Sequence, residues 1–169
     1  MSIEHDTDIL FHYALGVLKK GGGVFPQEYI DQLKEVIRFK LSLNNETDRG
    51  CALMAASLLE HRITELLRKN FVEDKSSTLL LSPSGPLGAF SNKIDISYAL
   101  ALIPQAMKRD LHLLRKIRNI FAHTTEVVTF DTPAIKDRCF ELQYAGHNRS
   151  SMHPRECFTQ ANYSRYGLH

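Results

Sequence analysis

The chain has 169 residues, of which 43% are hydrophobic and 24% are charged, and its formal net charge at pH 7 is +2. This length suits one domain, or one domain with a tail, and the composition is that of an ordinary globular protein. So small a net charge does not by itself indicate nucleic-acid binding, and an electrostatic argument must rest on local clusters of charge.

The cysteines and the N-terminus exclude several classes of protein. Cys51, Cys139 and Cys157 lie far apart and form no CxxC pair, so we expect buried free thiols rather than a zinc site or a disulfide framework, and no cofactor. The first residues, MSIEHDTD, are acidic, which argues against a secretory signal. The apolar runs fall short of the roughly 18 residues of a membrane span. The sequence therefore predicts a cytoplasmic protein without membrane contact.

Helical periodicity predicts two helices in the first 45 residues. The first covers residues 3–20 and ends at three glycines, and Pro26 suits the first turn of the second because its missing N–H would have no helical partner there. The expected apolar stripes are Leu10, Ala14, Val17 and Leu18, with Tyr13 alongside, in the first helix, and Ile30, Leu33, Ile37 and Leu41 in the second.

A third and longest helix is expected from about Asp48 to Phe71. It carries small residues early and large ones late on one arc, so we expect it to be the central packed helix. Asp48 lies on the same arc, where it can favour the helix dipole or serve as a buried partner for a cation. The apolar arc consists of Ala52, Ala55, Ala56, Leu59, Ile63, Leu66 and Leu67.

The remaining chain is predicted as loop, three helices and a tail. Residues 73–88 are rich in Ser, Pro and Gly and read as a loop whose leucines, Leu79 to Leu81, fold back on the core. Helices are expected over 91–103, from Pro104 to His123, and from Pro133 to about Gln143. About six helices make the chain all-α. We expect one helical domain over 1–143, and an irregular tail or partly formed last helix over 144–169.

The helix that begins at Pro104 has one apolar and one basic face. Its apolar arc contains Met107, Leu111, Leu114, Ile117 and Phe121, and the opposite face contains Lys108, Arg109, His112, Arg115 and Lys116. The helix ends in the sequence RNIFAH, and Asn119 and His123 lie on the basic face. A basic face of this kind is most often merely solvated, but it could also hold backbone phosphates.

Arg118 is the exception, because it falls in the middle of the apolar arc. A guanidinium stays charged and is costly to desolvate alone, so it needs an acid, a carbonyl group or water. Asp48 is the natural candidate, and Glu60 is the other. A structural salt bridge between two helices is the commoner outcome for such an arginine.

Arg118, Asn119 and His123 together permit one specific chemistry. RNA cleavage without a metal needs a base, an acid and fixed positive charge, which a histidine and an arginine partly supply. One chain offers a single such histidine, whereas a two-fold dimer would bring two to one cleft.

Two resemblances follow from these residues. RNIFAH resembles the Arg-x4-His motif of the HEPN superfamily. That likeness implies an up-and-down helical bundle that dimerises through its motif helices, and metal-independent endoribonuclease activity from Arg118, Asn119 and His123 in active members. A longer resemblance, over about 47–142, is to the mannitol operon repressor (MltR-like) family. It rests on TDRGCALMAASLLEHRITELLRKNF, GPLGAFSNKIDISYALALI, DLHLLRKIRNIFAH and FDTPAIKDRC in this order.

The MltR-like resemblance implies an all-helical regulator that need not bind DNA directly. One departure is the segment after PRECF, where QANYSRYGLH lacks the apolar helix expected of the family. The leading interpretation is a homodimeric transcriptional regulator that acts through a regulatory protein partner or single-stranded RNA. The alternative is a HEPN-type endoribonuclease, a toxin or defence component. Direct DNA binding is disfavoured, since the sequence has no convincing helix-turn-helix.

Overall fold

The computed structural model describes residues 3–20 and 26–163, and the side chains of 17–20, 150 and 163 lie outside the description. Every regular element in these residues is helical, which confirms the all-α prediction. The chain divides into two compact units, an N-terminal unit, Met1–Thr47, and a C-terminal unit, Asp48–His169. No helix in the described ranges is long and apolar enough to cross a membrane. The predicted domain boundary after residue 143 stays a prediction.

The N-terminal unit is a pair of packed helices, α1 (Ile3–Lys20) and α2 (Gln27–Asn44). Thr7 and Phe11 are buried among the described side chains of α1, and Lys34 of α2 lies 2.7 Å from Asp8 and 5.6 Å from the Phe11 ring centroid. The predicted α1 stripe is therefore wrong in register, because Leu10 and Tyr13 are exposed. The side chains of Val17 and Leu18 lie outside the described residues.

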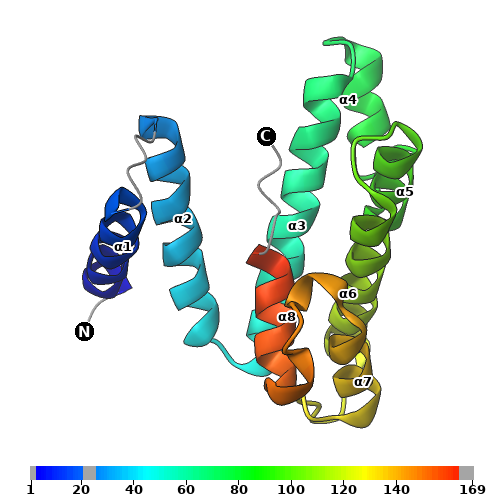
Figure 1. The fold of residues 1–169 in the computed structure, drawn as a ribbon. Coiled ribbons are helices and arrows are strands. Elements are labelled where there is room, and N and C mark those ends of the chain that lie inside the picture. Colours follow the sequence, from blue (N-terminus) through cyan, green and yellow to red (C-terminus); the bar gives the residue numbers. More distant parts are fainter. Residues whose placement is uncertain (1–2, 21–25, 164–169) are drawn as a thin grey trace. The chain divides into compact units, whose positions relative to one another are not determined.

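The C-terminal unit is built around α3 (Asp48–Asn70), as the sequence predicts (Figure 1). All seven residues of the predicted α3 arc are buried. The helix packs against α5 (Phe90–Ala99), α6 (Gln105–His123) and α8 (Pro154–Tyr163), and α7 (Pro133–Glu141) packs against α6 and α8. The small residues of the arc allow this close approach by several helices.

Two segments expected to be irregular are helical. Inside the predicted loop, α4 (Lys75–Leu81) begins where the Asp74 carboxylate accepts a hydrogen bond of 2.7 Å from the Ser77 N–H. Leu81 is buried, but Leu79 and Leu80 are exposed, so the loop does not fold back as expected. A side chain at Gly85 would overlap the carbonyl oxygens of Leu79 and Leu80, which explains the glycine after the helix.

The second segment is the predicted tail, which contains α8. Cys157, Phe158 and Ala161 of α8 are buried, and the rings of Phe121, Phe130 and Phe158 pack with centroid distances of 5.0 and 5.1 Å. The helix continues through QANY, where no further apolar helix was expected, and the rest of that expectation, SRYGLH, lies outside the described residues. Two short 3-10 turns, η1 (Gln143–Ala145) and η2 (Arg149–Ser151), lead into it.

The helix expected over 91–103 begins one residue earlier and ends at Ala99. The reason is Ala101, whose positive φ of 56° cannot continue a right-handed helix and reverses the chain before Pro104.

All three cysteines are free and buried, as predicted. Burial raises the pKa of the Cys139 thiol above its ordinary value, and the neighbouring Cys157 and Cys51 act in the same direction. The Cys139 and Cys157 thiols, both with a raised pKa, therefore carry little thiolate at neutral pH, and the burial of all three cysteines assigns them to packing.

Asp110 is a buried acid that the sequence does not single out. It lies on the core side of α6, and its Oδ2 accepts a hydrogen bond of 2.8 Å from the Tyr144 N–H in η1. Its Oδ1 lies 3.9 Å from Arg109 Nη1 and accepts no hydrogen bond from the described residues. Burial raises the pKa of this carboxyl, against the lowering effect of the backbone hydrogen bonds.

Candidate functional site

The candidate site lies where Arg118 of α6 meets Glu60 of α3. The Arg118 Nη2 is 3.8 Å from Glu60 Oε2, and its Nη1 donates a hydrogen bond of 3.2 Å to Asn119 Oδ1. The Arg118 side chain is 29% exposed, so it lies at the edge of the buried arc rather than in the middle. Asp110 and Leu113 are also buried, so the buried face of α6 is centred on the side of the helix away from Arg118.

Glu60 is shared with a second cation that sequence reasoning missed. The Nζ of Lys93 on α5 donates a hydrogen bond of 3.0 Å to Glu60 Oε1, and the Lys93 side chain is only 8% exposed. A wheel of α5 places Lys93 on the same arc as the buried Phe90, Ile94 and Ser97, and this position was the available signal. Glu60 therefore connects three helices by one carboxylate.

The cluster carries more positive than negative charge. Arg118 and Lys93 share the single carboxylate of Glu60, and Arg115 lies one turn before Arg118 on α6. The Nε of Arg115 is buried and has no hydrogen-bond partner among the described residues. A buried donor without a hydrogen-bond partner lowers the folding stability by roughly 1–3 kcal/mol, and a functional role is one explanation for such an unsatisfied group.

Asp48 is not the partner of Arg118. Its Oδ1 accepts a hydrogen bond of 2.8 Å from Arg155 Nη1 of α8, and its Oδ2 accepts one of 3.0 Å from the Phe130 N–H. The first turn of α3 thereby holds both α8 and the segment before α7. Arg49 holds the preceding segment, since its Nη2 donates to the carbonyl oxygens of Thr124 and Glu126.

His123 is the last residue of α6 and is exposed. Within the described chain, no hydrogen bond or ion pair joins it to Arg118 or Asn119. The structure thus brings Arg118, Asn119 and Glu60 together, and leaves His123 outside this hydrogen-bonded set.

The predicted basic face of α6 is largely neutralised within the chain. Asp95 of α5 lies 2.9 Å from Lys108 Nζ and 3.1 Å from His112 Nε2, and these two contacts lower the pKa of its carboxyl. Arg109 donates a hydrogen bond of 2.9 Å to the Glu141 carbonyl oxygen and lies 3.4 Å from its carboxylate. Among the five predicted phosphate contacts, Arg115 and Lys116 alone have no carboxylate partner in the described residues.

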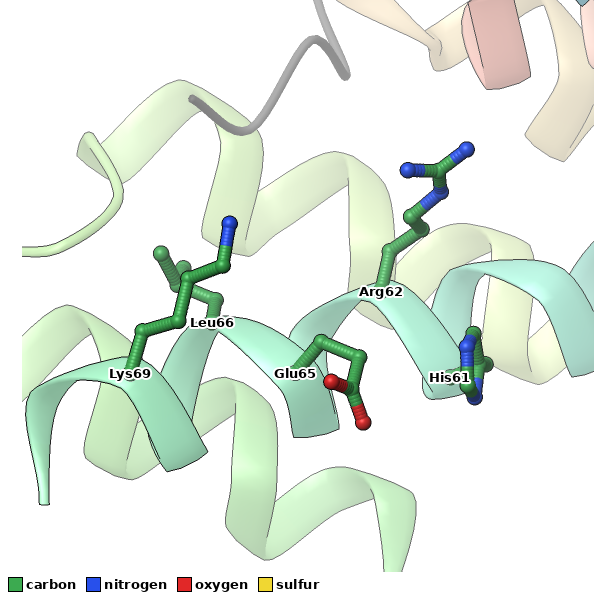
Figure 2. A pocket seen from close by; sticks show the side chains of 5 residues that line it. All are labelled: His61, Arg62, Glu65, Leu66 and Lys69. Atoms are coloured by element: carbon green, nitrogen blue, oxygen red, sulfur yellow. The ribbon is translucent and has the colours of Figure 1, made fainter.

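A separate hollow lies on α3, one turn beyond Glu60. It has a volume of about 230 Å³ and is lined by His61, Arg62, Glu65, Leu66 and Lys69. In Figure 2 the charged ends of Arg62 and Lys69 lie on the same side of the helix, whereas the Glu65 carboxylate points away from them. The Glu65 carboxylate is 2.6 Å from Arg68 Nη1. Nothing in the sequence pattern singled out this hollow, and of its lining residues only Leu66 had been assigned a place, on the apolar arc of α3.

The described residues bring no three His, Cys, Asp or Glu side chains together in a group that could hold a metal ion. The fold and the cluster define an all-helical protein whose polar cluster is built from side chains of three helices. Comparison with protein families then matches residues 30–165 to the mannitol repressor family, and the chain belongs to this family as a mannitol-repressor-like regulator. Comparisons with curated proteins and with solved structures gave no match. The HEPN motif stays a prediction.

Proposed function

We propose that the protein is a cytoplasmic transcriptional regulator that acts through contact with a regulatory protein partner, rather than by reading DNA or by holding RNA along α6. Membership of the mannitol repressor family supports the regulatory role. The observation that carries the mechanism is the neutralised face of α6. Asp95 already pairs with Lys108 and His112, and Glu141 pairs with Arg109. Little unpaired positive charge therefore remains on this face to bind phosphates and release counterions from a nucleic acid.

Direct DNA reading would also need a helix free to enter the major groove. The central helix α3 is covered by α5, α6 and α8, and α6 is covered by α3, α5 and α7. A protein surface needs no such excess of charge, because apolar and hydrogen-bonded contacts supply most of its affinity. A regulator of this kind would change the activity of another protein at its target operon.

The proposal predicts repression without promoter binding. In cells, we expect the chain to repress a reporter driven by the mannitol operon promoter. Purified protein should bind the same promoter fragment, and single-stranded RNA, no more tightly than the roughly 10–100 µM of non-specific association at physiological salt. Fluorescence anisotropy of labelled nucleic acid measures this affinity.

A matched variant separates the two mechanisms. Lys116 is exposed and has no carboxylate partner in the described residues, so Lys116→Glu removes charge without breaking an internal contact. Repression by Lys116→Glu should equal that of the wild type. Submicromolar RNA or promoter binding that Lys116→Glu weakens, together with weaker repression, would contradict the protein-contact mechanism.

The second candidate function is a metal-independent endoribonuclease. It is favoured by the partly exposed Arg118, which keeps a hydrogen bond to Asn119 on the last turns of the helix that carries His123. Against it, Glu60 offsets the charge that Arg118 would offer to a phosphorane, and His123 is not hydrogen-bonded into the set.

The cleavage experiment uses single-stranded RNA in the presence of EDTA, which inactivates contaminating metal-dependent nucleases. We expect at most weak cleavage by the wild type, and none by His123→Ala, because the imidazole is the group that this motif offers as general acid or base. Equal cleavage by both proteins would indicate a contaminating nuclease and would remove the catalytic interpretation.

A further inference from the structure

The outer face of α1 carries apolar side chains that α2 does not cover. Ile9, Leu10 and Tyr13 are 53%, 45% and 74% exposed. At about 100° per residue they share one arc of roughly 100°, turned away from Thr7 and Phe11, which are buried among the side chains described for this helix. Tyr13 is the most exposed aromatic residue among the described exposed hydrophobic side chains.

The N-terminal unit has almost no interior of its own. Among its described side chains only Thr7, Phe11 and Leu43 are buried, and the two helices have 18 residues each. A unit of this size buries too small a fraction of its surface to be stable by itself, and association with another chain is a common remedy. The exposed arc of α1 is the apolar surface that such an association would cover.

We infer that this arc is a self-association surface, at which α1 packs against α1 of a second copy of the chain. A two-fold axis beside Tyr13 would place each Tyr13 against its symmetry mate, so that one continuous patch serves both copies. We take this axis to be perpendicular to α1, so that the two helices run antiparallel and their dipoles oppose each other. Two helix pairs joined in this way form a four-helix bundle, in which each pair supplies the missing layer of the other.

Two observations distinguish this surface from the other candidate for a homodimer. The HEPN resemblance would assign the dimer contact to the motif helix α6, but the apolar face of this helix is buried within the chain and is not available for a dimer. In addition, α1 ends at Lys20, before the family match begins at residue 30, so the surface belongs to a part of the chain that the family assignment does not explain.

The exposed area suits a weak specific dimer. Side chains of this size present roughly 150–250 Å² each, so the three contribute about 350 Å² per copy at their present exposure. Two copies would bury about 700 Å² from these residues, which is below the roughly 1,200 Å² of a standard specific interface and in the range of weak, transient contacts. We therefore expect a dissociation constant in the micromolar range.

Sedimentation velocity of the full chain tests the inference. At about 100 µM the wild type should be mainly dimeric, and Leu10→Glu/Tyr13→Glu should weaken association at least tenfold with unchanged helical circular dichroism. Val127→Glu is the matched control, because Val127 is 96% exposed in the segment before α7 and should leave the dimer intact. A monomeric wild type, or a double variant that associates as the wild type does, would overturn the proposal.

Oxidative cross-linking checks the geometry without disturbing folding. The three native thiols are buried, so Tyr13→Cys adds the one accessible thiol among the described residues. A two-fold axis beside Tyr13 brings the two new sulfur atoms within bonding reach, and we expect a disulfide-linked dimer. Val127→Cys should stay monomeric under the same oxidant. Equal cross-linking of both variants would mean random collision. A Tyr13→Cys protein that gives no cross-link would exclude the antiparallel pairing.

Discussion

Glu60→Gln should lower the free energy of unfolding by about 2–4 kcal/mol, because it leaves Lys93 and Arg118 without their shared carboxylate. Most of the effect should come from Lys93, whose ammonium group is almost completely buried. For a chain of this length the change corresponds to a fall in Tm of about 5–15 °C. Thermal and urea unfolding followed by circular dichroism measure both quantities.

The matched control is Glu65→Gln on the same helix. Glu65 pairs with Arg68 at 2.6 Å, but both side chains are exposed, so this substitution should cost less than about 0.5 kcal/mol. In the double variant Glu60→Gln/Lys93→Met, the buried cation is gone and much of the lost stability should return. Equal losses for Glu60→Gln and Glu65→Gln would mean that the three-helix cluster does not stabilise the fold.

Asp48→Ala is expected to cost about 2–3 kcal/mol, since it removes one ion pair and one charge-assisted backbone hydrogen bond. Both lost partners, Arg155 and the Phe130 N–H, hold the C-terminal elements against α3. Hydrogen exchange should therefore become faster across α8 while it changes little in α5.

Asp131→Asn provides the comparison for this second substitution. Asp131 lies 3.4 Å from His153 Nε2 at an exposed position, so its loss should leave both the stability and the exchange of α8 almost unchanged. Uniformly faster exchange over the whole C-terminal unit in Asp48→Ala would instead show that α8 does not open independently.

Helical periodicity was enough to predict the long elements of this fold. The α3 arc and the apolar face of α6 follow from spacing alone, because an apolar stripe at 3.6-residue intervals has to be covered. The same reasoning missed α4 and left the segment of α8 as either an irregular tail or a partly formed last helix. The segment of α4 was predicted as a loop because of its serines, proline and glycines, and the mixed His, Ser and Tyr composition around α8 gave no clear helical periodicity. Asp74 and Pro154 nevertheless mark the starts of these two helices.

The partners of the candidate site could not be predicted in the same way. A helical wheel tells which face a residue occupies, but it does not tell which neighbouring helix faces it. Asp48 and Arg155 are 107 positions apart, and their pairing depends on how α8 returns to α3. The need of Arg118 for an acid was inferred from its position, whereas the choice of Glu60 and the presence of Lys93 required the packing of three helices.

The buried carboxyl of Asp110 has a consequence for tolerance of acid. Because its pKa is raised in the folded chain, the folded state takes up a proton at a pH where the unfolded chain, with an ordinary value of 3.8, is still ionised. This group therefore favours folding more as the pH falls toward 3.8, and the benefit fades as the pH rises through the raised pKa. Asp95, whose pKa is lowered, begins to lose its contribution only below the ordinary value. Mild acidification should consequently relieve the cost of burying the Asp110 charge, and so raise the contribution of this group to the free energy of unfolding, before it weakens the contacts of α5 with α6.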